Sequence, residues 1–254
     1  MIYDVQKAGI GKRISAYIFD LILLVIAATG VAFLLSVLFQ YDAKVEAHAS
    51  LQEQYEAEYG VSFDLSAEEF DALDEAGKTY LNEAYKAFKT DPDVARLDSL
   101  LLNLVLLISS LGILIPYLLL EFLVPLKLGN GQTLGKKIFG IAVMRVDGVR
   151  LPPMLLFIRT VLGKYTLETM LPLFLCFVMT MGVMPVACVL GLAILAVTQL
   201  FFIIAKPLRT PIHEMISATV SVDFASQMIF ETPEELMEYK KQLHAQEAER
   251  AEYK

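Results

Sequence analysis

The chain has 254 residues, of which 56% are hydrophobic, and its mean hydropathy is +0.55. Its formal net charge of −8 excludes a typical nucleic-acid-binding protein, since such proteins carry a basic surface. Its two cysteines are too few for a disulfide framework or a structural zinc site. The apolar residues come in long unbroken runs rather than at the spacing of amphipathic elements, which is typical of a membrane protein.

Four segments are long and apolar enough to cross a bilayer, which takes about 20 residues per helix. The first two runs each contain one charge, Asp20 and Glu121 respectively. The third run has 39 residues, enough for two spans, and Gly182 and Pro185 in its middle favour a tight hairpin. A cleaved signal peptide is the alternative for the first run, but that run is too long and no small-x-small site follows. The predicted fold is an all-α integral membrane bundle with spans at 17–39, 100–125, 166–182 and 186–205.

The distribution of Lys and Arg predicts the orientation, because all 21 of them lie outside the apolar runs. The connection 126–165 carries seven in 40 residues, whereas the connection 40–98 carries five, diluted by 15 acidic residues. Short connections rich in Lys and Arg stay in the cytoplasm. We therefore expect residues 1–16, 126–165 and 225–254 inside and 40–98 outside, in a plasma or inner membrane.

The outer connection, 40–98, is acidic and is predicted to be largely helical. Ser66 and Glu69 fit a capping box, and apolar residues follow at helical spacing, so residues 67–89 are expected to form one amphipathic helix. Residues 42–59 are expected to form another. The many acids raise calcium binding as an alternative, but the Asp-x-Asp-x-Asp-Gly loop is absent. We expect a solvated acidic face and no bound metal.

The inner connection predicts a small β element at the cytoplasmic face. Its start, Gly129–Lys136, resembles a phosphate-binding loop only superficially, since Lys137 stands where Ser or Thr is required. Further on, Ile141–Val146 and Thr219–Phe224 have the composition and alternation of short strands. A lone strand leaves its backbone groups unpaired, so we expect these two segments to pair with each other.

Two further helices are predicted near the cytoplasmic face. Residues 154–165 are basic and amphipathic, which favours a helix lying in the membrane interface. The closing segment, 206–224, leads to Thr232 and Pro233, an N-cap followed by proline at the first helical position. Residues 233–252 are therefore expected to form a charged cytoplasmic helix.

The candidate functional residues are the ionisable ones inside or beside the spans, since each is costly in lipid and needs a partner or a water-filled path. Arg13 and Asp20 share one helix face but lie about 10 Å apart along the axis. We therefore expect Arg159, with its planar fork, to bring Asp20 and Glu214 into one charged cluster with Arg13. Two roles stay open, a polar mouth for an ion or solute and a structural network. The candidate site residues are Arg13, Asp20, Glu121, Arg159, His213 and Glu214.

The remaining polar residues do not suggest an enzyme. His213 is the one histidine near a span, and a lone histidine favours a hydrogen-bonded role over metal binding. Gln199 and Asn103 are expected to make hydrogen bonds between spanning helices. No Ser/His/Asp or Cys/His set follows from the spacing, so we expect no enzymatic activity and no cofactor.

The sequence patterns around several of these residues resemble those of a known family, the RDD family of membrane proteins. Arg13-x6-Asp20 resembles the opening of that family, Gly131–Val143 is similar to its inner-loop motif, and Arg159 lies where its next helix carries an arginine. His213 and Glu214 resemble its closing segment, which usually has Asp where this chain has Glu214. The resemblance implies a multi-span protein without a cofactor, whose role is mostly undefined and for which transport has been proposed.

Two functions are therefore weighed. The leading hypothesis is that the charged cluster helps to move a small ion or solute. The alternative is a non-transporting scaffold or assembly partner that acts through the acidic outer loop or the cytoplasmic tail. Four spans make a small pathway in one chain, so transport favours a homo-oligomer. The expected partners are the lipid bilayer, further copies of the chain and, for the scaffold, an unidentified protein; nucleic acid is not expected.

Overall fold

The computed structural model describes residues 5–205 and 210–252. The described chain is mostly helical and has one two-stranded sheet. It folds as two compact units, the first comprising residues 1–28 and 113–254 and the second residues 29–112. The elements that carry the candidate site belong to the first unit.

Among the residues that the structure describes, four helices are long and apolar enough to cross a membrane, and most of their surface is not covered by other parts of the protein. In each helix, no more than 17% of the most apolar 18-residue window is buried within the protein. Continuous apolar surface of this extent needs lipid around it, and helices satisfy their backbone groups internally. The predicted four-span helical class is confirmed. The helices are Ile10–Leu38, Pro92–Leu128, Pro153–Thr180 and Pro185–Phe202.

The first spanning helix is α1 (Ile10–Leu38), and the second consists of α5 (Pro92–Pro116), the π-helical η1 (Tyr117–Leu123) and α6 (Val124–Leu128). Pro125 accounts for the wide turns, because its ring lacks an N–H and crowds the carbonyl of Glu121 four residues earlier. That carbonyl accepts a hydrogen bond from Thr160 Oγ1 at 2.9 Å instead.

The third spanning helix differs from the prediction. It runs without a break through α8 (Pro153–Phe157), the π-helical η2 (Ile158–Met170) and α9 (Leu171–Thr180). The expected interfacial helix 154–165 is therefore the first part of the same helix as the span expected at 166–182. Pro172 lies inside this helix at the start of α9, and the wide turns of η2 before it absorb the irregularity without ending the helix.

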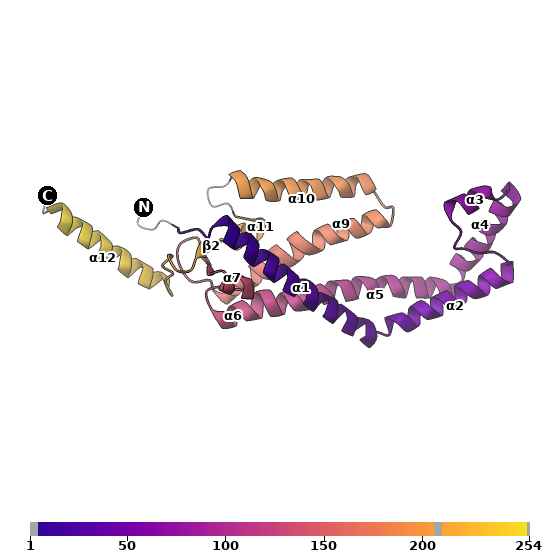
Figure 1. The fold of residues 1–254 in the computed structure, drawn as a ribbon, viewed down its shortest axis with the longest axis horizontal. Helices are drawn as coiled ribbons and strands as arrows, with labels where there is room; N and C mark the ends of the chain where they lie inside the picture. Colours follow the sequence, from indigo (N-terminus) through magenta and orange to yellow (C-terminus); the bar gives the residue numbers. More distant parts are fainter. Residues whose placement is uncertain (1–4, 206–209, 253–254) are drawn as a thin grey trace. The chain divides into compact units, whose positions relative to one another are not determined.

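The fourth spanning helix, α10 (Pro185–Ala205), runs back beside α9 as a hairpin, as Figure 1 shows. Gly182 lies in the turn with a φ of 71°, a left-handed conformation that glycine adopts without a steric cost. The predicted break at Gly182 and Pro185 is confirmed.

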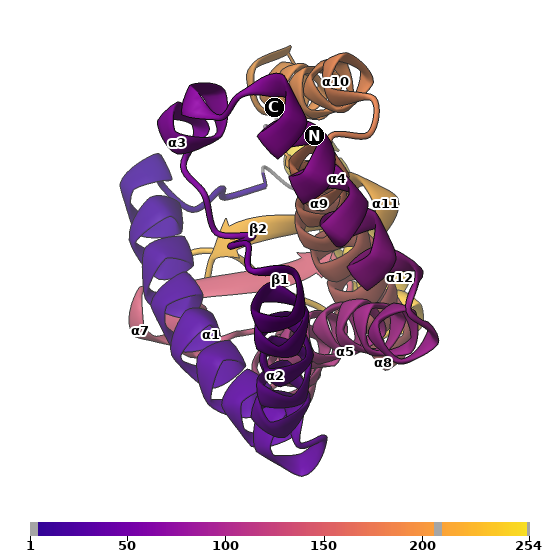
Figure 2. The ribbon, with the colours of Figure 1, turned by 90° about the vertical axis from the view of Figure 1, so that its right-hand side faces the viewer.

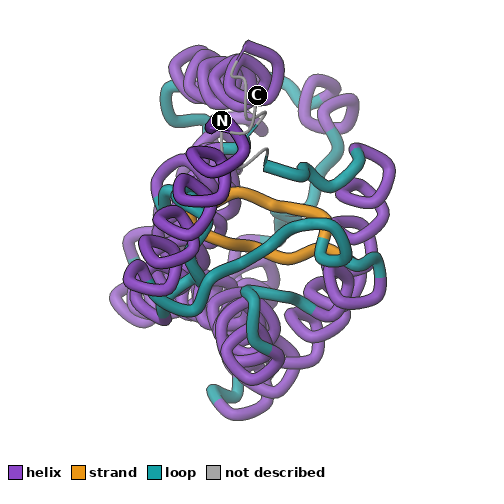
Figure 3. The backbone as a smooth tube through the Cα atoms, turned by 90° about the vertical axis from the view of Figure 1, so that its left-hand side faces the viewer, coloured by secondary structure: helices purple, strands orange, loops and turns teal. Residues whose placement is uncertain are grey.

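The sheet pairs β1 (Ile141–Arg145) with β2 (Thr219–Asp223) in antiparallel register, Ile141 opposite Asp223, which confirms the predicted pairing. Figures 2 and 3 show the two strands side by side among the helices. The free edge of β2 is covered by the N-terminal segment, where the Asp223 amide donates to the Gln6 carbonyl at 2.8 Å. Covered edges leave few backbone groups unpaired.

Two helices of five residues, α7 (Leu134–Ile138) and α11 (Ile212–Ile216), connect the sheet to the spans. The tail forms the 20-residue helix α12 (Pro233–Glu252). The predicted cap of α12 is present, since Thr232 Oγ1 accepts from the Glu235 amide at 3.2 Å. Phe230 and Leu236 pack with Val149 and hold the start of α12 against the hairpin that follows β1.

The second unit contains α2 (Tyr41–Tyr59), α3 (Ala67–Ala72) and α4 (Glu75–Thr90). The capping box of Ser66 and Glu69 is confirmed, but the helix expected over 67–89 is broken after Ala72. Asp74 causes the break, because its side chain accepts from the Gly77 amide at 2.7 Å and starts a new helix. The core of the unit forms around Phe88, which is 2% exposed.

Candidate functional site

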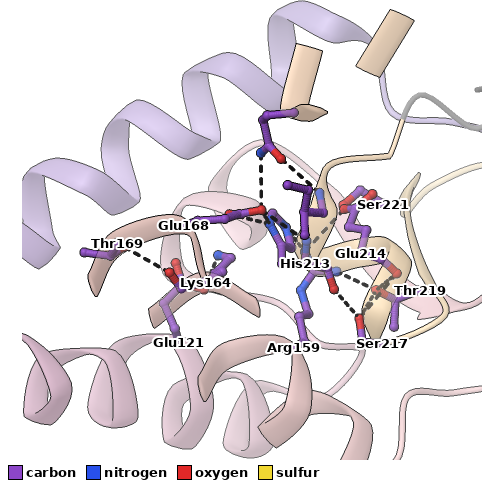
Figure 4. A network of polar contacts seen from close by, with 12 residues as sticks. Glu121, Arg159, Lys164, Glu168, Thr169, His213, Glu214, Ser217, Thr219 and Ser221 are labelled. Atoms are coloured by element: carbon purple, nitrogen blue, oxygen red, sulfur yellow. Dashed lines mark hydrogen bonds and ion pairs between the residues drawn. The ribbon is translucent and has the colours of Figure 1, made fainter. Parts of the chain in front are cut away.

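A buried ion pair between Arg159 and Glu214 lies at the centre of the candidate site (Figure 4). Arg159 is 3% exposed and Glu214 1% exposed, and Arg159 Nη2 lies 3.3 Å from Glu214 Oε1. The strand β2 supplies two hydroxyls. Thr219 Oγ1 accepts from Arg159 Nη1 at 2.7 Å, and Ser221 Oγ donates to Glu214 Oε1. The sheet therefore fixes both members of the pair.

A second guanidinium reaches the same carboxylate from α1. Arg13 Nη2 lies 3.5 Å from Glu214 Oε2, so each oxygen of Glu214 faces an arginine. Burial by itself raises the pKa of Glu214, but the charges of Arg159 and Arg13 outweigh burial and hold that pKa below its ordinary value. The expectation that Arg13, Arg159 and Glu214 meet agrees with this geometry.

His213 links the ion pair to a second carboxylate, Glu168 of η2. Its Nδ1 lies 2.8 Å from Glu168 Oε2, and its Nε2 lies 3.2 Å from Arg159 Nη2. Arginine only donates, so Nε2 must accept and the ring proton sits on Nδ1, where it is donated to Glu168. Burial, and next the charge of Arg159, lower the pKa of His213 to about 4. The ring is neutral at pH 7.

Gln199 and Gly163 hold this arrangement together from α10 and η2. Gln199 Nε2 donates to Glu168 at 3.2 Å, and its carbonyl oxygen accepts from the Ile212 amide at 3.2 Å. The expectation that Gln199 bonds between helices agrees with these contacts. At Gly163, an added Cβ atom would lie 2.6 Å from the Cβ of His213, so only glycine allows α11 to come this close.

Glu121 forms a separate ion pair with Lys164. The Lys164 Nζ atom lies 2.6 Å from Glu121 Oε2, and the two side chains are 11% and 10% exposed. Both residues lie on π-helical turns, as do Arg159 and Glu168. Such wide turns are frequent at functional sites, because they turn side chains away from the ordinary helix faces.

Asp20 is held differently from the prediction. Its carboxylate accepts from Thr133 Oγ1 at 2.5 Å and from the Gly135 amide at 2.8 Å. Among the described residues, the expected contact between Arg159 and Asp20 is absent, and a hydroxyl and a backbone amide at the start of α7 hold the carboxylate instead. Gly135 is required for this approach, because a Cβ atom there would lie 2.5 Å from the Ala16 carbonyl oxygen.

Lys136 of α7 interacts electrostatically with the two carboxylates that α1 and η1 supply, Asp20 and Glu121. It is half-buried, its Nζ donates to Thr133 Oγ1 at 3.4 Å, and the charges of Glu121 and Asp20 act on it. Burial, and next the repulsion from Lys164, lower the pKa of Lys136 to about 8. The site as a whole balances four carboxylates with four cations. The carboxylates are those of Asp20, Glu121, Glu168 and Glu214, and the cations are Arg13, Lys136, Arg159 and Lys164.

Part of this network was not predicted from the sequence. Glu168 was visible as an acid at the start of the third apolar run, and the rule that singled out Asp20 applies to it equally. The sequence gives no comparable signal for Thr219 and Ser221, since hydroxyls are common on strands. Within residues 5–205 and 210–252, no group of three His, Cys, Asp or Glu side chains is arranged to hold a metal ion.

Comparison with known proteins links the chain to one family. The sequence model of the RDD family matches residues 7–218, which include all of the candidate site residues. No curated protein and no solved structure matches the chain.

Proposed function

The chain belongs to the RDD family of multi-pass membrane proteins, and we propose that it moves a small ion or solute across the membrane through the charged site. The proposal involves no covalent chemistry and no cofactor. It places the protein in a plasma or inner membrane, with the charged site at the cytoplasmic ends of the spans.

The observation that carries the proposal is the burial of Arg159 with Glu214. A buried ion pair rarely stabilises a protein more than apolar residues of the same volume would, because both charges lose their hydration. In a membrane protein, such groups usually line the path of an ion or substrate. A chain under selection for stability alone has little reason to keep this pair.

The balance of charges supports the same role. A balanced site can receive a small cation if one internal cation gives way, since the carboxylate charge left uncompensated then attracts the incoming ion. Lys136 is the candidate for that cation. Among the described residues, its ammonium group makes one long hydrogen bond, to Thr133 Oγ1 at 3.4 Å in the same turn of α7. The negative charges of Glu121 and Asp20 also act on the ammonium group of Lys136.

Flux through purified protein in vesicles tests the proposal. Vesicles that contain the wild-type protein should pass an ion or solute that empty vesicles retain, and Arg159→Gln or Glu214→Gln should abolish that flux. The matched controls are Arg150→Gln and Glu231→Gln, which remove an exposed ion pair of the same unit with a 2.6 Å contact. Flux that equals that of empty vesicles for all ions tried, or flux that persists in both buried variants, contradicts the proposal.

The alternative, a scaffold, is favoured by one observation. Residues 29–112 form a compact unit of their own, with capped helices and a core around Phe88. Transport does not require such a unit, whereas a partner protein could bind it. In the scaffold case, Arg159→Gln and Glu214→Gln lower the melting temperature, and wild-type vesicles show no flux.

A further inference from the structure

The short helix α7 lies beside the part of α1 that enters the membrane. Its Gly135 amide donates to Asp20 Oδ1 at 2.8 Å, and a Cβ atom added at Gly135 would lie 2.5 Å from the Ala16 carbonyl oxygen. At the other end of α7, Phe139 packs in one apolar cluster with Ala16. Because Asp20 belongs to the apolar run 17–39, these contacts fix α7 at the level where α1 passes from the lipid headgroups into the hydrocarbon.

One face of α7 is apolar and exposed. Leu134 and Ile138 are 37% and 63% exposed and lie four residues apart, so they project from the same side of the helix. Gly135 faces α1, and Lys136, whose charge interacts with the carboxylates of the site, points about 160° away from both apolar side chains. The exposed pair therefore faces neither α1 nor the charged site, and at this depth it meets the acyl chains next to the headgroups.

The same face of α7 carries a positive charge. Lys137 is exposed, lies three residues after Leu134, and its ammonium group has no partner among the residues that the structure describes. A lysine at the edge of the hydrocarbon extends its side chain to the headgroup level, where lipid phosphates lie. Two apolar side chains beside one cation match the chemistry of a lipid, which offers acyl chains below and a phosphate above.

We infer that α7 binds an anionic lipid of the leaflet at this end of the spans, with Leu134 and Ile138 among the acyl chains and Lys137 on the phosphate. The distribution of Lys and Arg predicts this leaflet to be the cytoplasmic one, which is rich in anionic lipids. Such a lipid holds α7 against α1, and with it the hydroxyl and the amide that bond to Asp20. The inference uses the contacts and the exposure of α7 and does not depend on the proposed transport.

Tryptophan fluorescence in vesicles tests the depth of α7, because the chain contains no tryptophan and one substitution gives a single reporter. Ile138→Trp should be quenched by lipids that carry bromine on the acyl chain near the glycerol. Met237→Trp is the matched control, since Met237 is 56% exposed on α12, outside the spans, and should escape quenching. Val25→Trp, at a position 55% exposed within α1, gives the quenching of a residue in lipid. Quenching of Ile138→Trp no greater than that of Met237→Trp would place α7 in water or against another protein and overturn the inference.

The same reporter measures the preference for an anionic lipid. In vesicles of phosphatidylcholine, a small fraction of brominated phosphatidylglycerol should quench Ile138→Trp more than the same fraction of brominated phosphatidylcholine. Adding Lys137→Gln should lower this relative affinity about five-fold, the contribution of one lysine near an anionic membrane surface. Lys241→Gln removes an exposed charge of α12 instead and should leave the preference unchanged. Equal quenching by the two lipids while Lys137 is present, or an undiminished preference after Lys137→Gln, contradicts the binding of a lipid phosphate by Lys137.

Discussion

The Nε2 atom of His213 lies 3.2 Å from Nη2 of Arg159, so an imidazole accepts a hydrogen bond from a guanidinium inside a buried ionic site. A protonated ring has no lone pair at Nε2 and would place two donors face to face. The contact therefore forms only when His213 is neutral, and for this reason the stability of the site depends on pH.

The first prediction concerns that pH dependence. The pKa of His213 is about 4 in the folded protein and 6.5 for the ordinary side chain, so the unfolded chain binds more protons between these values. Stability is then fully present above pH 6.5 and is lost as pH falls toward 4, by up to about 3 kcal/mol. The melting temperature in detergent should fall between pH 7 and pH 4.5.

His213→Gln isolates the contribution of the ring to this pH dependence. Glutamine still donates and accepts but does not titrate, so the variant should lose much less stability on acidification than the wild type. His244→Gln serves as the control and should leave the wild-type profile unchanged, since the side chain of His244 is 65% exposed on α12 and lies outside the buried site. An identical acid profile for His213→Gln and the wild type would show that other groups cause the loss.

The second prediction separates the contacts of Arg159 from those of Asp20. Arg159→Gln and Glu214→Gln each leave a buried charge with fewer partners and should cost about 3–5 kcal/mol of unfolding free energy. Because the two side chains are paired, the double variant should lose less than the sum. Chemical unfolding in detergent measures all three variants.

Asp20→Asn combined with Arg159→Gln provides the contrast. Asp20 is bonded to Thr133 and Gly135 rather than to Arg159, so these two losses should add within about 0.5 kcal/mol. Strong coupling between Asp20 and Arg159 would mean that Asp20 belongs to the arginine cluster after all.

The contrast between Glu214 and Asp20 also shows what the sequence could predict. Charges in apolar runs need partners, and that rule was enough to bring Arg13, Arg159 and Glu214 together. The partners of Asp20 could not be predicted, because a backbone amide such as that of Gly135 leaves no mark in the composition. Whether the Gly135 amide can reach Asp20 depends on how closely α7 packs against α1, which is a property of the folded chain.

The spans and the sheet were predictable for a similar reason. Long apolar runs and paired β-rich segments are dictated by the needs of backbone groups in lipid and in strands. The continuity of the helix Pro153–Thr180 was not predictable, since the wide π-helical turns of η2 leave no distinct pattern of apolar residues in the sequence. The four charged residues on η1 and η2 owe their positions to those turns.

The third prediction tests the close packing of α11 on η2. A methyl group at position 163 would lie 2.6 Å from the His213 Cβ and 2.8 Å from its Cα, so Gly163→Ala should force the two helices apart. Overpacking of this kind costs about 1–3 kcal/mol, seen as a lower melting temperature. Gly30→Ala is the matched control, because nothing lies within 4 Å of its added methyl group. A Gly163→Ala protein as stable as Gly30→Ala would contradict the packing.

The last prediction is the orientation of the chain in the membrane. The connection 126–165 carries seven Lys and Arg and the outer connection 40–98 carries five among 15 acids, so the first should stay in the cytoplasm. With Cys176 and Cys188 replaced by Ala, a thiol reagent that cannot cross membranes should label Glu75→Cys in intact cells. It should leave Asp147→Cys and Lys240→Cys unlabelled until the cells are opened. The side chains of Glu75 and Asp147 are 94% and 41% exposed, and Lys240 is half-buried on α12, so a reagent in water can reach all three positions on their own side. Labelling of Asp147→Cys in intact cells, together with protection of Glu75→Cys, would invert the topology and place the buried ion pair of Arg159 and Glu214 at the outer face.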